Sequence, residues 1–149
     1  MFLVEDVIML IRTIKLHIFV LLATLISISS VQASHISGGD ISYTCLGGGV
    51  YKLTLNLYRD CSGISMGTSQ TLDIKNDCGY PAQTVSATLI PNSATGESYT
   101  NVSQLCSADS LNNTCYGGTL PGMQKYTYEA IITLTQTCDS YHFSWGVCC

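Results

Sequence analysis

The sequence predicts an all-β domain: an antiparallel, immunoglobulin-like β-sandwich that is stapled by disulfides and preceded by a helical signal peptide. Three observations support this class. Residues 50–59 (VYKLTLNLYR) alternate apolar and polar side chains, as a half-buried strand does. All eight cysteines lie in the last 105 residues, from Cys45 to Cys149. An apolar run of signal-peptide length stands near the N-terminus.

The first 33 residues have the composition of an export signal. Arg12 and Lys15 supply a positive region, and residues 16–28 (LHIFVLLATLISI) form the apolar run. Small residues then stand at the −3 and −1 positions of a cleavage site between Ala33 and Ser34. The sequence therefore predicts residues 1–33 as a signal peptide and residues 34–149 as the mature domain. The alternative, an uncleaved transmembrane anchor, would need roughly 20 uninterrupted apolar residues, which is longer than the run at residues 16–28.

Charge after residue 33 is sparse and mildly acidic, with four basic and eight acidic residues. Nucleic-acid binding requires clustered lysines and arginines, and four scattered cations form no such patch. The sequence therefore predicts no nucleic-acid partner, and it predicts contact with a membrane only through the signal peptide.

The cysteines predict a disulfide framework, because an even number in an exported chain is typical of paired thiols. No two cysteines have C-x-x-C spacing, and only His35 and His142 remain after cleavage, so neither a metal nor another cofactor is expected. Four bridges are the natural expectation, and eight cysteines allow 105 pairings. Adjacent cysteines on a strand point to opposite faces, so the last two should have different partners. The candidates are Cys45, Cys61, Cys78, Cys106, Cys115, Cys138, Cys148 and Cys149.

Six strands are expected. The strand at 50–59 follows a strand at 41–45, and three glycines between them allow a tight reversal. The others are expected at 68–74, 84–90, 126–135 and 141–148, separated by glycine and proline breakers. Residues 98–118 are predicted as a long loop, held by a bridge between its own Cys106 and Cys115 or by bridges to neighbouring strands. This loop is either a simple connection or a binding surface.

One motif suggests hydrolase chemistry. Residues 63–67 match the G-x-S-x-G pattern around Ser65, and Asp109 and His142 follow in the chain order of that family. A nucleophile elbow needs a strand before it and a helix after it, whereas residues 68–74 are expected to be a strand. A loop turn is therefore the favoured interpretation, with a secreted serine hydrolase using Ser65 as an alternative.

Other candidate ligands are weaker. His35 and His142 are isolated, and the carboxylates and amide of Asp73, Asn76 and Asp77 lack the spacing of a calcium loop. Trp145, in phase with Phe143, is expected to pack in the core beside a disulfide. We assign no catalytic, cofactor or metal residue from the sequence.

Several segments together resemble a known kind of protein. They are residues 34–43 (SHISGGDISY), 45–48 (CLGG), 57–61 (LYRDC), 114–122 (TCYGGTLPG), 126–128 (YTY), 143–145 (FSW) and the final Cys148-Cys149. They resemble the N-terminal region of large secreted surface proteins of Bacteroidetes, of the gliding-motility-associated and type IX secretion cargo kind. The likeness covers essentially all of the chain after residue 33.

The resemblance implies export, then a β-rich N-terminal module, followed in most relatives by immunoglobulin-like or PKD-like repeats and a C-terminal sorting domain. Because this chain stops at Cys149, it is expected to be a fragment whose last cysteines find partners further on. The expected function is that of a non-catalytic, secreted or cell-surface module on the exterior of the outer membrane, with a structural, adhesion or gliding-motility role.

The expected partners are other domains of a larger surface protein, or an extracellular protein or glycan. A stand-alone domain that binds carbohydrate or protein is the remaining alternative, and it is compatible with exposed tyrosines at Tyr58, Tyr99 and Tyr116.

Overall fold

The computed structural model describes residues 9–10, 12–20 and 36–146, and the chain divides into two units, Met1–Gln32 and Ala33–Cys149. In the first unit residues 9–10 and 12–20 are α-helical. Among the described residues, no helix has both the length and the apolar character needed to cross a membrane. The cleavage site expected between Ala33 and Ser34 lies outside the described residues.

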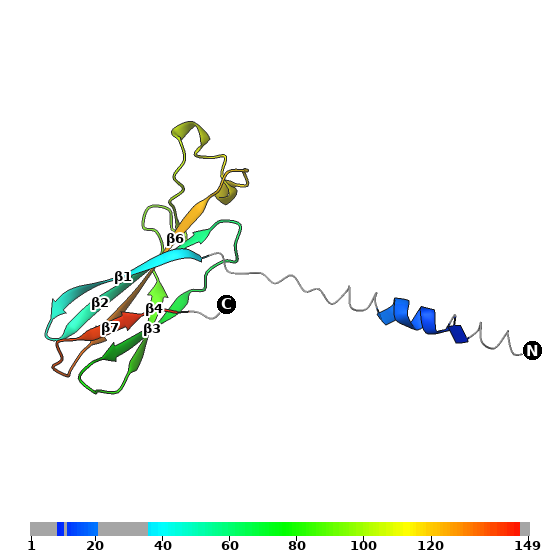
Figure 1. The fold of residues 1–149 in the computed structure, drawn as a ribbon. Helices are drawn as coiled ribbons and strands as arrows, with labels where there is room; N and C mark the ends of the chain where they lie inside the picture. The colour runs from blue at the N-terminus through cyan, green and yellow to red at the C-terminus, as the bar shows by residue number, and fades with distance from the viewer. Residues whose placement is uncertain (1–8, 11, 21–35, 147–149) are drawn as a thin grey trace, which may run out of the picture. The chain divides into compact units, whose positions relative to one another are not determined.

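The second unit is an antiparallel β domain (Figure 1). All six expected strands are present in it, and the short strand β5 is additional. The strands are β1 (Ile36–Gly47), β2 (Val50–Asp60), β3 (Ser69–Asn76), β4 (Gln83–Leu89), β5 (Thr100–Asn101), β6 (Met123–Thr133) and β7 (Tyr141–Ser144). Two short 3₁₀ helices, η1 (Ser107–Asp109) and η2 (Thr114–Tyr116), interrupt the loop between β5 and β6.

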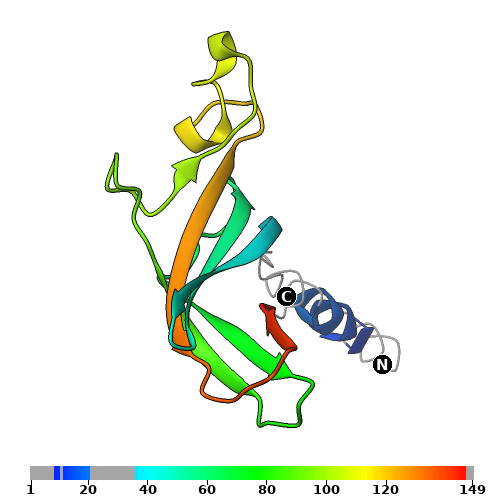
Figure 2. The same cartoon turned by 90° about the vertical axis from the view of Figure 1, so that its left-hand side faces the viewer.

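The strands form one sheet in the order β1-β2-β6-β4-β3-β7, with β5 paired to β6. β2 and β6 pair over eleven residues each, whereas β4 meets β6 only at Thr88↔Glu129 and Leu89↔Tyr128. The sheet therefore turns sharply at this short contact and nearly closes as a barrel does (Figure 2). The rings of Tyr43 on β1 and Phe143 on β7 lie 6.3 Å apart, so the two outer strands approach each other.

The core follows the alternation in the sequence. Leu53, Leu55 and Leu57 of β2 are at most 1 % exposed, and they face alternate residues of β6 and the inner residues of β3 and β4. Burying a leucine contributes roughly 1.5–3 kcal/mol. The inner residues from the other strands are Leu72, Ile74, Ala87, Tyr126, Tyr128, Ala130 and Ile132.

Two neighbouring glycines of β1 have opposite surroundings. A Cβ on Gly39 would lie 2.8 Å from Cδ2 of Leu57 and 2.9 Å from the backbone oxygen of Asn56, whereas a Cβ on Gly38 would meet nothing within 4 Å.

We expect Gly39→Val to lower the free energy of unfolding by about 1–3 kcal/mol, because the side chain must displace the β2 backbone. Gly38→Val should change it little. Urea denaturation measures both, and equal effects would contradict the register of β1 on β2.

Among the described residues two disulfides are present, Cys61–Cys115 and Cys78–Cys138. Cys115 therefore ties the long loop to the end of β2, which is one of the two arrangements expected for that loop. Cys45 and Cys106 are exposed and bonded to no described cysteine. Cys45 lies opposite Tyr51 at the start of β2, whereas Leu105, the neighbour of Cys106, lines a pocket with Asp60 at the end of β2. The two cysteines are thus roughly 30 Å apart along the strand direction and cannot bridge to each other. Cys148 and Cys149 lie outside the described residues.

Candidate functional site

A cleft of about 660 Å³ opens on the outer face of the sheet, where β1 begins and β2 ends. This volume is within the usual range of ligand pockets. We call it the loop cleft, because the loop that follows β5 forms one of its walls. Its lining residues are Ser37, Gly38, Tyr58, Asp60, Val102, Ser103, Gln104, Leu105, Pro121, Gly122 and Met123.

Strand alternation supplies one side of the loop cleft. Tyr58 and Asp60 point outward because their neighbours Leu57 and Arg59 are buried. Gly38 lies opposite Tyr58, and the register shift between Ile36 and Gly38 makes Ser37 an extra residue of a bulge. The absence of a side chain on Gly38 leaves the loop cleft open toward the edge of the sheet.

Covalent and hydrogen bonds hold the opposite wall. The Cys61–Cys115 disulfide joins the loop to β2, and the N–H of Cys61 donates to the carbonyl of Gly122 at 3.0 Å. The N–H of Met123 donates to Oγ of Ser103 at 2.9 Å. This wall is therefore fixed to the sheet before any ligand arrives, which reduces the entropy cost of binding.

The surroundings of the loop cleft are acidic and polar. Tyr58 donates its hydroxyl to Oδ2 of Asp40 at 3.3 Å, and Nδ2 of Asn56 donates to Oδ1 of Asp40 at 2.9 Å. Partial burial, and then the charge of Asp40 and this hydrogen bond, raise the pKa of Tyr58 above 10.0, so it stays protonated at neutral pH. No lysine or arginine lines the described cleft. With Asp60 in its lining and Asp40 bonded to Tyr58, the loop cleft is more favourable to a neutral or cationic group than to an anion, although Lys125 of β6 is the cross-strand neighbour of Tyr58.

A buried arginine supports the link between β2 and β3. Arg59 is 4 % exposed, and its guanidinium donates to the carbonyls of Asp60 (2.9 Å), Ile64 (2.8 Å) and Cys61 (3.0 Å). The guanidinium carbon lies 5.8 Å from the centre of the Tyr126 ring. Arg59 thus fixes the path of the chain directly after β2.

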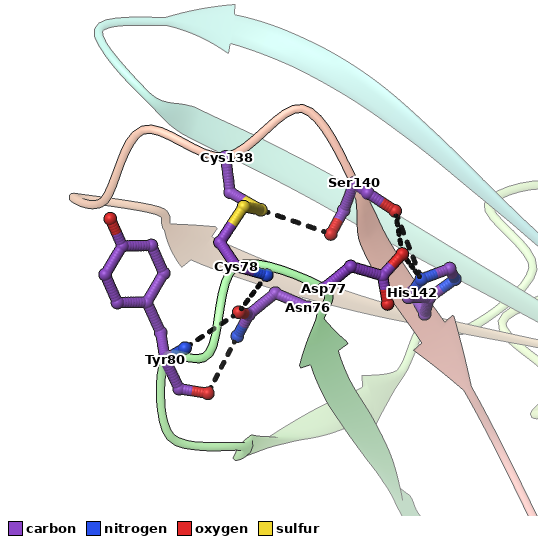
Figure 3. Close-up of polar contacts among 7 residues, drawn as sticks. All are labelled: Asn76, Asp77, Cys78, Tyr80, Cys138, Ser140 and His142. Carbon is purple, nitrogen blue, oxygen red and sulfur yellow. Dashed lines mark hydrogen bonds and ion pairs between the residues drawn. A yellow bond between two sulfur atoms is a disulfide. The ribbon is translucent and has the colours of Figure 1, made fainter.

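A second polar cluster joins β7 to the end of β3 (Figure 3). Oγ of Ser140 donates to Oδ2 of Asp77 at 2.6 Å, and Nε2 of His142 lies 2.9 Å from the same oxygen and 3.2 Å from Oγ of Ser140. In a catalytic triad the carboxylate and the serine use different nitrogens of the imidazole. Here both use Nε2, so the imidazole cannot relay a proton from Ser140 to Asp77, and the cluster is a contact between strands.

The residues of the hydrolase motif are not brought together. Ser65 is exposed in the link between β2 and β3, and the next element is β3, so the helix of a nucleophile elbow is missing there. His142 of β7 is the cross-strand neighbour of Lys75, which lies near the far end of β3, roughly 20 Å from the start of that strand. Asp109 lies in η1.

The remaining candidates have structural roles. Asn76 orders the turn after β3, since its Oδ1 accepts from the N–H groups of Cys78 and Tyr80 (Figure 3). Trp145 and Phe143 pack against the core, as expected, and Nε1 of Trp145 donates to Gln70 at 3.0 Å. His35 lies outside the described residues. In the described part of the chain, no three His, Cys, Asp or Glu side chains gather closely enough to hold a metal ion.

Of the three tyrosines considered for binding, Tyr58 alone lines the loop cleft. Tyr99 packs against Tyr126 with ring centres 5.9 Å apart, and Tyr116 is 59 % exposed on η2. No local pattern in the sequence marks Gly38, Leu105 or Met123 as neighbours, because they come from three separate segments.

The contacts of Asp77 with Ser140 and His142 predict a pH-dependent contribution to the stability of the fold. The hydrogen bond from Ser140, then that from His142, lowers the pKa of Asp77 below 3.8. A lowered folded-state pKa stabilises the fold above the unfolded value and ceases to do so as the pH falls through the folded value. We expect Asp77→Asn to be less stable than the parent at pH 6, and this difference to be smaller at pH 2. Urea denaturation at both pH values, with Asp139→Asn as control, measures this. A difference of the same size at both pH values would contradict the assignment.

Comparison of the chain with protein-family models, with curated proteins and with solved structures gives no match.

Proposed function

We propose that this chain is a non-catalytic, exported module of the cell surface with a structural or adhesive role, and that the loop cleft is where it binds its partner. If the resemblance to gliding-motility-associated and type IX secretion cargo proteins of Bacteroidetes holds, this role would be on the outer-membrane exterior. Its partners would be other domains of a larger surface protein, or an extracellular protein or glycan.

Export is supported by the cysteine chemistry. The Cys61–Cys115 and Cys78–Cys138 disulfides favour an oxidising compartment, because disulfides are rare in reducing cytosol. The signal-like residues 1–33, with cleavage between Ala33 and Ser34, supply the route. Domain 34–149 would then be the working unit.

The domain architecture suits a surface module. Along the single sheet, the short contact between β4 and β6 separates β1, β2 and β6 from β4, β3 and β7, and the core lies inside the sheet. We assign this arrangement to the immunoglobulin-like sandwiches, in which these two groups of strands would be two sheets. Such modules bind through loops at one end, and the loop cleft occupies that position.

The observation that carries the proposal is the fixed wall of the loop cleft. Half-buried Leu105 and Met123 lie in this wall, which the Cys61–Cys115 disulfide holds in place. A preorganised, partly apolar cleft with polar groups at its margin is the usual form of a binding site. The same cleft also suits the alternative of a stand-alone domain for carbohydrate or protein. The structure brings no comparable support to hydrolysis at Ser65.

A binding assay with matched variants tests the proposal. The labelled, oxidised full chain is incubated with intact cells of the source organism, and the retained fraction is measured. Leu105→Asp should reduce retention about tenfold or more, because a charge would enter the apolar wall. Leu111→Asp, in the same loop but 73 % exposed and outside the loop cleft, should not. Equal retention of both variants would contradict the proposal.

A further inference from the structure

Strand β1 has an open edge in the described part of the chain. It is the outer strand of the sheet and pairs with β2 alone. Each N–H and C=O of β1 that points away from β2 therefore has no partner strand. Tyr43 contacts Phe143 of β7, so the fully open part is residues 38–42.

Between its two register shifts this edge has little of the usual protection against strand addition, Asp40 being its one charged residue. Proteins commonly guard edge strands with proline, lysine, bulges or short length. β1 has twelve residues and contains no proline, lysine or arginine. Its register shifts occur only between Ile36 and Gly38 and between Cys45 and Gly47, so residues 38–45 are regular. An extended segment can therefore pair with them.

The open edge and the loop cleft meet at Gly38. Gly38 lines the loop cleft, and a Cβ there would meet nothing within 4 Å. Side chains of directly opposed residues on neighbouring strands have Cβ atoms about 5 Å apart. A long apolar side chain placed opposite Gly38 on an added strand can therefore pass over this glycine toward Leu105 and Met123.

The charge on β1 indicates a second feature of a strand that adds to its edge. Asp40 follows Gly38 on the same face and is the single charged residue of β1. Its carboxylate accepts from Asn56 and Tyr58, and neither the residues of β1 nor the described lining of the loop cleft include a lysine or arginine. A basic residue opposite Asp40 would therefore be attracted, and an acidic one repelled.

We propose that β1 accepts an extended strand from a partner protein, with an apolar side chain of that strand in the loop cleft beside Gly38 and a lysine or arginine opposite Asp40. Main-chain hydrogen bonds would supply affinity and the cleft would supply specificity, as in other cases of strand addition. The inference rests on the proposed function, since it names the partner of the same cleft.

Selection from a display library of random twelve-residue peptides on the oxidised full chain tests this inference. We expect the recovered peptides to have a basic residue two positions from a large apolar one. Gly38→Trp should weaken their binding about tenfold or more, because the indole would occupy the route into the loop cleft. Asp40→Lys should weaken it and shift selection toward acidic peptides. Gly146→Trp is the matched control, since a Cβ there also meets nothing within 4 Å.

Three results would overturn the inference. One is recovery of no peptide whose binding Gly38→Trp reduces. Another is concentration-dependent dimerisation of the chain that Gly38→Trp abolishes, since a second copy would then occupy the edge. The third is binding to a glycan array, lost in Gly38→Trp, without any peptide binding. If Leu105→Asp still abolishes retention on cells in these cases, the proposed function stands and the peptide inference alone fails.

Discussion

Replacing Cys61 and Cys115 together by alanine is expected to lower the free energy of unfolding by about 4 kcal/mol. The two cysteines are 54 residues apart, and their bond restricts this long loop in the unfolded chain. The same bond fixes the wall of the loop cleft to β2, so binding should fall together with stability. Guanidinium denaturation of the oxidised chain measures the change.

Two exposed cysteines provide the control for this experiment. Cys45 and Cys106 are exposed and bonded to no described cysteine, so Cys45→Ala and Cys106→Ala should each change stability by less than about 0.5 kcal/mol. If Cys106→Ala proved as damaging as the double replacement, Cys106 rather than Cys61 would be the partner of Cys115.

Truncation of Arg59 is the second large effect that we expect. Arg59→Ala should cost about 2–3 kcal/mol, because three carbonyls of the β2–β3 link lose their charged donor and a cavity opens beside Tyr126. Thermal and urea denaturation of the variant measure the loss.

Arg59→Lys should restore little of the stability that Arg59→Ala loses. A guanidinium presents several donors in a fixed plane, whereas one ammonium cannot reach the carbonyls of Asp60, Cys61 and Ile64 in the same geometry. Lys75→Ala is a suitable control, because Lys75 is an exposed residue of β3. Full stability of Arg59→Lys would show that charge alone, rather than the hydrogen-bond pattern, holds the link.

The strands were predictable from sequence because alternation is a local property. Leu53, Leu55 and Leu57 are buried as their period implies, and the same holds for Tyr126 and Tyr128. β5 was missed because two residues are too few to show a period. The order of strands could not be predicted, since the β2–β6 pairing joins residues more than 60 positions apart and leaves no local trace.

The site was less predictable than the strands for the same reason. Asp77 and His142 were each candidate ligands in the sequence, but their contact depends on the pairing of β3 with β7. Leu105 and Met123 lie in the loop cleft because the Cys61–Cys115 bond folds the loop against the sheet. With 105 possible pairings of eight cysteines, that bond could not be chosen from the sequence.

Mass spectrometry of the protein recovered from the outside of the source cells tests the central claim, an exported disulfide-linked module, most directly. Peptide mapping without reduction should give an N-terminus at Ser34 and linked peptides for Cys61–Cys115 and Cys78–Cys138. A chain that stays inside the cell, keeps residues 1–33 and has all of its thiols reduced would contradict the account.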